Sequence, residues 1–302
     1  MKPKETINLY RVISLLVIAL VTFGVMGGLC AKSHLYPDEW LSMFFLTLIF
    51  LLVCIFELEY ERKQKGISAN TQTTFIRLSV TYTVSGGLIY AISYLPEFYR
   101  PVMIPVILLT AVSNSMVAVS FGLFFDLVLA LTVGGSFYAL AAYMMLTMLA
   151  AVLAQALKEK KYRMGVSLLT FFFSLMIPEL FSYLSTKEMQ KYSLLYAFGT
   201  AFLTFLTAAF LFHRLLHEAD QEIENHLLDI VSEDYSEVKA LKDFSMVEYR
   251  HAVKVSDIAC RCAKEVGYRA NLCLAGGFYY RMGRWIGEPY IKNAVNKAES
   301  LC

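Results

Sequence analysis

The sequence predicts an all-α protein: a polytopic helical membrane domain of about eight spans, followed by a helical domain on the cytosolic side. Of its 302 residues, 57% are hydrophobic and only 17% are charged. These are too few polar side chains to cover a water-soluble globule of this size. Between Arg100 and Lys158 the only charged side chain is Asp126, whereas residues 214–302 contain 12 Lys+Arg and 14 Asp+Glu. The contrast marks a membrane domain, residues 1–212, followed by a charged tail.

Five apolar segments are long enough to cross a bilayer, whose hydrocarbon core is about 30 Å thick. They are residues 12–31, 41–56, 75–95, 164–184 and 193–212. The first of them follows a basic N-terminus and could be mistaken for a signal peptide. Its length matches a bilayer and no small-residue cleavage site follows it, so we expect a retained anchor.

The uncharged block 101–157 has room for two long spans or three short ones, with breaks expected at 113–115 and 134–136. Basic connections decide between them, because cytosolic loops carry an excess of Lys and Arg. With the N-terminus inside, the basic connection 158–163 is also inside only if the block crosses an odd number of times. We therefore expect three crossings, eight spans in all, and cytosolic N- and C-termini in the cell membrane. Residues 102–113 are short for a crossing, so a re-entrant segment stays open as an alternative.

Two ionisable residues, Asp126 and Glu179, lie deep in apolar sequence. Such residues are costly in a membrane and are functional candidates by default. The alternative for each is structural, either an interhelical hydrogen bond or a side chain at the end of a span that reaches water. Both interpretations stay open from the sequence.

The tail divides into a juxtamembrane stalk and linker, residues 213–245, and a helical domain, residues 246–302. An amphipathic pattern predicts a stalk helix over 213–230. From Tyr249 to Cys302 the chain has 9 basic and 4 acidic residues, a net charge of +5. This charge suits an anion such as a phosphate or a lipid headgroup, with a solvated charged face as the alternative.

Two helices are expected in the last domain. The first runs over 246–266 with Gly267 as its C-terminal stop, and the second over 270–282 with Gly283 as its stop. The apolar periodicity of the first helix predicts a buried stripe formed by Ala252, Val255, Ala259, Cys262 and Val266.

Four stretches of the tail, taken in order, resemble the start of an HD-superfamily phosphohydrolase domain. They are EYRHAVKV at 248–255, EVGYRANL at 265–272, GGFYYRMGR at 276–284 and GEPYIKN at 287–293. The closest type is the seven-transmembrane HD family of PgpH-type cyclic-di-AMP phosphodiesterases, although the large extracellular domain of that family has no counterpart here. The resemblance implies a degenerate, incomplete HD-like domain, because the chain stops at Cys302, before the family's downstream histidines and closing aspartate.

Position by position, His251 matches the family's first metal-binding histidine. Tyr280 stands where the motif histidine belongs, Arg281 where the motif aspartate belongs, and Arg284 where a lysine is usual. In the family two metal ions, Mn or Fe, generate hydroxide and clamp phosphate oxygens. A neutral phenol is a poor substitute ligand, and a guanidinium sets a fixed positive charge against a dication. The resemblance therefore implies that His251 is vestigial and that no metal cofactor is bound.

The same replacement favours phosphate binding. A guanidinium is a good bidentate partner for phosphate, so Arg281, together with Arg284 and Tyr280, is the candidate ligand-binding group. Each residue also has a structural alternative. His251 is then an ordinary polar residue, the arginines favour a helix C-terminus, and Tyr280 is a packing residue.

We expect a membrane-embedded signalling or regulatory pseudoenzyme without hydrolytic activity. Its membrane part would read a signal within the bilayer, and its tail would bind a cyclic dinucleotide or a partner protein, with a homodimer as one form of partnership. One alternative is a metal-dependent cyclic-dinucleotide phosphodiesterase completed by another chain, against which Tyr280 and Arg281 argue. A second is a small-solute transporter, resting on Asp126 and Glu179. No nucleic acid polymer is expected as a partner.

Overall fold

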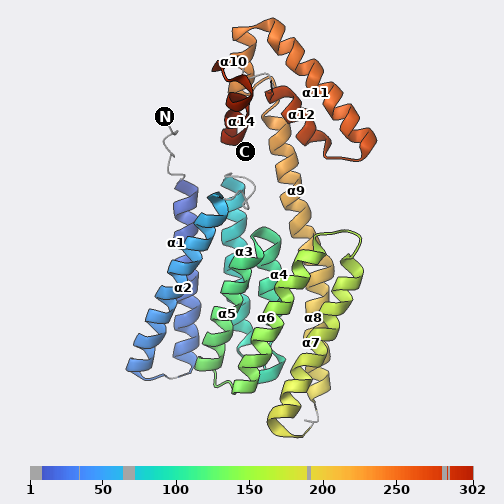
Figure 1. The fold of residues 1–302 in the computed structure, drawn as a ribbon. Coiled ribbons are helices and arrows are strands. Elements are labelled where there is room, and N and C mark those ends of the chain that lie inside the picture. The colour runs from blue at the N-terminus through green and yellow to red at the C-terminus, as the bar shows by residue number, and fades with distance from the viewer. Residues whose placement is uncertain are drawn as a thin grey trace. The chain divides into compact units, whose positions relative to one another are not determined.

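The computed structural model describes residues 9–33, 35–63, 72–188, 192–280, 284 and 286–301. These residues form helices and turns without any strand (Figure 1). The chain divides into two compact units, residues 1–217 and residues 218–302. The first unit is described before the second.

Seven helices that begin in the first unit are long and apolar enough to cross a membrane. They are α1 (Leu9–Lys32), α2 (Pro37–Lys63), α3 (Gln72–Ile92), α5 (Ser115–Thr132), α6 (Phe137–Leu157), α7 (Arg163–Thr186) and α8 (Ser193–Leu206) with the π-helical turn η2 (Thr207–Leu211). The five clear spans expected from the sequence are confirmed as long apolar helices. Both expected breaks in the central block are also found, at residues 113–114 and 133–136.

The first segment of the central block is α4 (Met103–Val112), and its bounds agree with the short segment 102–113 that the sequence predicts. Ten residues of α-helix extend about 15 Å, which is half the thickness of a hydrocarbon core. Its residues are almost all buried, as are Phe98 and Tyr99 of the short helix η1 (Glu97–Tyr99) that precedes it. The central block 101–157 therefore contains the long apolar helices α5 and α6 and the half-length helix α4.

Polar contacts nevertheless show that α4 returns the chain to the end of the bundle where α1 begins. Three contacts join helix ends there: Arg11 with Glu59, Ser120 with Glu57 at 2.7 Å, and Gln155 with Ser115 at 2.7 Å. At the opposite end, Lys32 Nζ of α1 donates to the Ser93 carbonyl oxygen, which follows α3, at 2.9 Å. Helix α3 thus ends at one end of the bundle, and α5 starts at the other. Gln155 lies near the end of α6 and contacts Ser115, so the basic connection 158–163, which follows α6, lies at the end where α1 starts.

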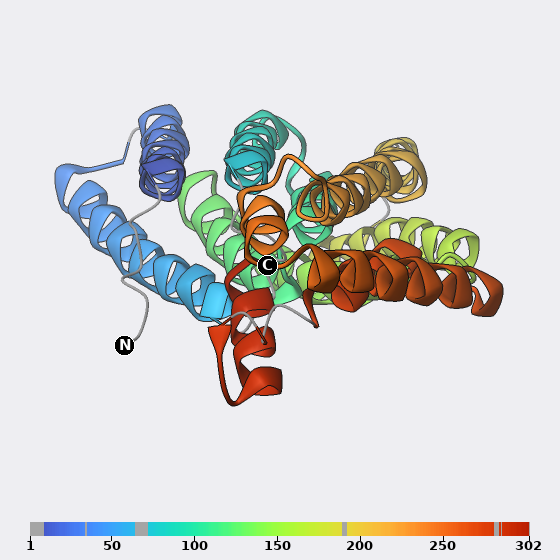
Figure 2. The same ribbon diagram turned by 90° about the horizontal axis from the view of Figure 1, so that it is seen from above.

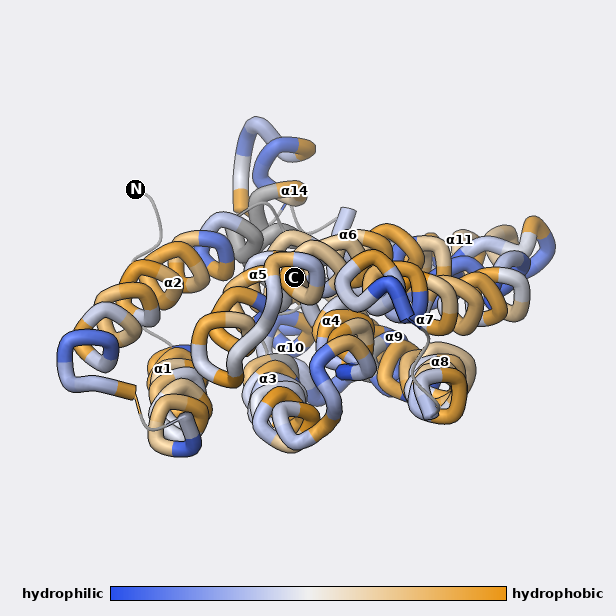
Figure 3. Tube along the Cα trace, turned by 90° about the horizontal axis from the view of Figure 1, so that it is seen from below, coloured by the Kyte–Doolittle hydropathy of each residue, from blue (hydrophilic) through white to orange (hydrophobic). Residues whose placement is uncertain are grey.

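The helices of the first unit stand in two rows when seen along their axes (Figures 2 and 3). One row contains α1, α3 and α8, the other contains α2, α5, α6 and α7, and α4 lies between the rows. Many large apolar side chains of this bundle are exposed, as expected for helices that face lipid. The half-length α4 thus fills the interior of the bundle.

The second unit contains the end of α9 (Phe212–Asp229), followed by α10 (Ser236–Phe244), α11 (Met246–Val266), α12 (Ala270–Tyr279) and α14 (Tyr290–Leu301). Helix α9 confirms the helix expected over 213–230, whereas α10 lies where a linker was expected and α14 was not expected. The expected bounds of α11 are confirmed: Ser245 Oγ accepts from Glu248 N at 3.3 Å, and Gly267 ends the helix with a φ of 73°. The expected stop at Gly283 lies outside the described residues.

The buried face of α11 differs from the predicted stripe. Ala252 is buried as expected, but the other buried positions are Ser256 and Ala263, while Val266 is 83% exposed. Close packing against α12 explains the rotation, because a Cβ on Gly277 would lie only 2.9 Å from the Ser256 Cα. The apolar core of this unit consists of Leu227, Ile230, Val238, Leu241, Ala252, Ala275, Phe278 and Tyr279.

Candidate functional site

Asp126 is the most deeply buried acidic side chain that the structure describes, at 1% exposure in the middle of α5. Its Oδ2 accepts a hydrogen bond from Thr147 Oγ1 of α6 at 2.7 Å. Its Oδ1 is buried and has no hydrogen-bond partner among the described residues. A buried carboxyl oxygen without a donor is costly, which makes this oxygen a candidate position for a proton or a hydrogen-bonding ligand.

Gly122, one turn before Asp126 on α5, explains why this contact forms. A Cβ on Gly122 would lie 2.6 Å from Thr147 Cγ2 and 2.8 Å from Val106 Cγ2 of α4. Without that atom, α4, α5 and α6 approach closely enough for Thr147 to reach the carboxyl of Asp126. Small residues allow the same close approach of backbones in helical membrane proteins generally.

Arg100 is a second buried ionisable residue of the bundle, at 4% exposure, and the sequence analysis did not select it as a candidate. Its Nη1 donates to the Tyr143 hydroxyl of α6 at 3.2 Å, and its Nε donates to the Leu95 carbonyl oxygen at 3.3 Å. The Tyr143 hydroxyl donates in turn to the main-chain carbonyl of Glu97, whose side chain accepts from the Ser136 amide. The signal that could have found Arg100 is its place directly before Pro101 and the long uncharged block.

The two buried charges are joined through one face of α6. Tyr143 and Thr147 are four residues apart and therefore neighbours on the helix surface. Tyr143 contacts Arg100, and Thr147 contacts Asp126. We define these four residues as the intramembrane polar cluster. In this cluster a buried cation and a buried carboxyl each contact a side chain of α6.

Glu179 does not join this cluster. It lies on α7 after Pro178, and its Oε1 accepts from the Tyr99 hydroxyl at 3.5 Å. The Tyr99 ring also stacks with that of Tyr196, at 6.0 Å between ring centroids. Glu179 thus makes the interhelical contact that the structural alternative described.

In the tail, the structure brings Arg284 to the start of α11. Arg284 Nη1 lies 3.3 Å from Glu248 Oε1, one turn before His251. His251 and Tyr280 are both exposed, and Arg281 lies outside the described residues. Within the described ranges no three His, Cys, Asp or Glu side chains are grouped so that they could hold a metal ion.

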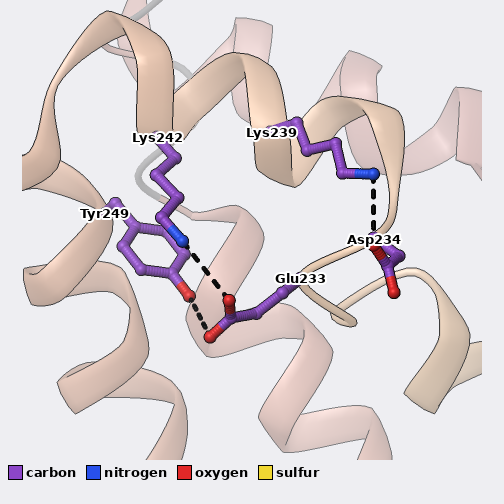
Figure 4. A network of polar contacts seen from close by, with 5 residues as sticks. All are labelled: Glu233, Asp234, Lys239, Lys242 and Tyr249. Carbon is purple, nitrogen blue, oxygen red and sulfur yellow. Dashed lines mark hydrogen bonds and ion pairs between the residues drawn. The ribbon is translucent and has the colours of Figure 1, made fainter.

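A further polar network joins α10 to α11 (Figure 4). Glu233 accepts from the Tyr249 hydroxyl at 3.3 Å and pairs with Lys242 Nζ at 3.3 Å, while Lys239 pairs with Asp234 at 3.2 Å. Partial burial raises the pKa of Tyr249 above its usual value, and the negative charge of Glu233 adds to this effect. These contacts hold the start of α11 against the preceding turn.

Comparison of the chain with protein-family models, with curated proteins and with solved structures finds no match in any of the three. The resemblance to the seven-transmembrane HD family therefore rests on the four tail stretches alone and stays a prediction. The intramembrane polar cluster and the Glu248–Arg284 pair are defined by their own contacts.

Proposed function

We propose that this protein is a membrane-embedded signalling protein whose tail is a non-hydrolytic, HD-like binding module for a phosphate-bearing ligand, with a cyclic dinucleotide as the ligand class. The bundle supplies the membrane part, and the intramembrane polar cluster is its candidate site for a signal read within the bilayer. The tail supplies the part that binds ligand or partner.

The Glu248–Arg284 ion pair is the observation that carries this proposal. A carboxylate and a phosphate offer a guanidinium the same kind of charged oxygen acceptor. Glu248 therefore occupies the position on Arg284 that a ligand phosphate would take, and ligand binding would exchange one for the other. Because Glu248 belongs to the first turn of α11, the exchange would release a contact that holds this helix.

The absence of hydrolysis follows from the side chains in the motif. Tyr280 and Arg281 stand where the family uses a histidine and an aspartate. Neither a phenol nor a guanidinium is a suitable ligand for the ions that activate water in such sites. The tail would bind the phosphate ester and leave it intact.

The test measures cyclic-di-AMP binding to the full-length protein in detergent, with and without manganese, while the same samples are assayed for hydrolysis. We expect metal-independent binding without turnover, weakened in Arg284→Ala and strengthened in Glu248→Gln. Arg269→Ala is the matched control, because Arg269 pairs with Glu224 at 3.2 Å elsewhere on the same unit. Manganese-dependent turnover would assign an enzyme, and absence of binding would move the function to the bundle and a protein partner.

A second candidate, small-solute transport, is favoured by the unpartnered Oδ1 of Asp126. A buried carboxyl that binds and releases a proton is a common component of membrane transport sites. Solute flux into liposomes that is lost in Asp126→Asn and retained in Glu179→Gln would support this candidate. Flux that is absent, or equal in both variants, would remove it.

A further inference from the structure

The inward face of α11 is set by its contact with α12. Ala252, Ser256 and Ala263 are buried, and Gly277 of α12 packs directly against Ser256. The helix presents its opposite face to the surroundings. We call this opposite face the outer face of α11.

The outer face combines cations with apolar side chains. Its members are Val247, Arg250, His251, Lys254, Ile258, Arg261, Cys262 and Glu265, all of them exposed. Arg250, Lys254 and Arg261 lie one and two turns apart along one edge of this face. Beside them Val247 is 77% exposed and Ile258 is 63% exposed, while Asp257 lies at the margin.

The three cations of the outer face differ in their partners from four other cations of the same unit. Lys239, Lys242, Arg269 and Arg284 each pair with a carboxylate at 3.2 or 3.3 Å. Within the described part of the chain, no ion pair involves Arg250, Lys254 or Arg261. Their charge is thus available to an external anion.

We propose that the outer face of α11 docks on a bilayer surface that contains anionic phospholipid. Headgroup phosphates complement the three cations, and the exposed Val247 and Ile258 provide the apolar contact that interfacial helices make just below the headgroups. The unit is covalently joined through α9 to a bundle of membrane-spanning length, so a bilayer is always present at high effective concentration. This inference does not depend on the proposed function of the tail, because it concerns a different set of residues from Glu248 and Arg284.

Cys262 provides a reporter within the outer face. The full-length protein, carrying Cys262 as its one retained cysteine, is placed in nanodiscs of phosphatidylcholine alone or of phosphatidylcholine with phosphatidylglycerol. The rate at which a membrane-impermeant maleimide reacts with Cys262 is then compared between the two lipids. We expect the reaction to be about fivefold slower with the anionic lipid at low salt and the two rates to converge at high salt.

Matched charge reversals decide whether the outer face is responsible. Lys254→Glu with Arg261→Glu should bring the ratio of the two rates to about one. Lys239→Glu with Lys292→Glu makes the same change in net charge on α10 and α14, away from α11, and should leave the ratio unchanged. Because each ratio compares one variant in two lipids, changes in the intrinsic reactivity of the thiol cancel.

Two results would overturn the proposal. Equal rates in the two lipids for the unsubstituted face would show that anionic headgroups do not cover it, whether it is open to water or covered by protein. An equal loss of the ratio in both double variants would show that net charge, and not the outer face, governs the approach to lipid.

Discussion

The bundle and the tail both bury apolar side chains but differ in what covers their outer surface. On the bundle, large apolar residues face outward and hydroxyl groups are buried, as for Thr110 and Thr132, which donate to carbonyls of their own helices. In the tail, apolar side chains form the core and the ion pairs lie at the surface. Burial of apolar area drives folding in water, whereas helices in lipid associate through close packing and polar contacts.

The comparison extends to single carboxylates. Asp126 is buried with one donor, so the loss of that donor leaves a buried carboxyl group without any hydrogen-bond donor. Glu233 is exposed and has both Tyr249 and Lys242 as partners, so the loss of one of them is compensated by water. Polar contacts should therefore matter more for the stability of the bundle, and apolar contacts more for that of the tail.

The largest expected effect comes from the small core of the tail. Phe278→Ala should lower the free energy of unfolding of the second unit by about 3–5 kcal/mol, because it empties the centre of that core. Hydrogen exchange should then speed up in α11 and α12 and stay unchanged in α5 and α6. Tyr268→Ala, at an exposed position, is the control and should change neither unit. Equal loss of protection in both units would show that they do not fold independently.

The next effect tests close packing in the bundle. Gly122→Ala adds an atom that would meet Thr147 and Val106 below 3 Å, whereas Gly87→Ala adds an atom with nothing within 4 Å. Gly122→Ala should be less stable than Gly87→Ala by about 1–3 kcal/mol, because overpacking forces the neighbours apart. Thermal unfolding in detergent measures the difference. Equal stability would mean that α4, α5 and α6 are not in the close contact described.

A smaller effect is expected from the hydrogen bond within the polar cluster. Thr147→Val removes the donor to Asp126 and should cost about 0.6 kcal/mol, the average for interhelical hydrogen bonds in membranes, and at most about 1.7 kcal/mol. Thr132→Val is the control, since this buried hydroxyl bonds only to a carbonyl of its own helix. Unfolding of both variants in the same detergent should separate them, and a greater loss in Thr132→Val would contradict the importance of Asp126.

The smallest effect is the response of the tail to alkaline pH. The pKa of Tyr249 is raised in the folded state, so the folded protein holds this proton more tightly than the unfolded chain does. The resulting stabilisation is fully present below about pH 10, the usual pKa of tyrosine, and is lost as the pH rises through the folded value. Tyr249→Phe should reduce this alkaline loss, and Tyr268→Phe should not. Stability curves against pH that coincide for all three proteins would refute the assignment.

Features that depend on residues close together in the sequence could be predicted. The long apolar segments, the breaks at 113–115 and 134–136, and the bounds of α11 follow from span length and from local signals such as Ser245 and Gly267. Asp126 was found as a candidate because a charge in apolar sequence is visible without any structure. Span length, helix caps and a lone charge are properties of a few consecutive residues, which explains this success.

Other features depend on contacts between residues far apart in the sequence, and these needed the folded chain. The burial of α4 inside the bundle, the buried position of Arg100 against Tyr143, and the rotation of α11 onto Gly277 are all of this kind. An apolar period shows that a helix has a face to bury, but the fit of a partner helix chooses which small residues it packs against. The sequence was therefore sufficient for the long apolar helices, α9 and α11, but not for α10 and α14. Packing decided the rotation of the helices and the partners of their buried ionisable side chains.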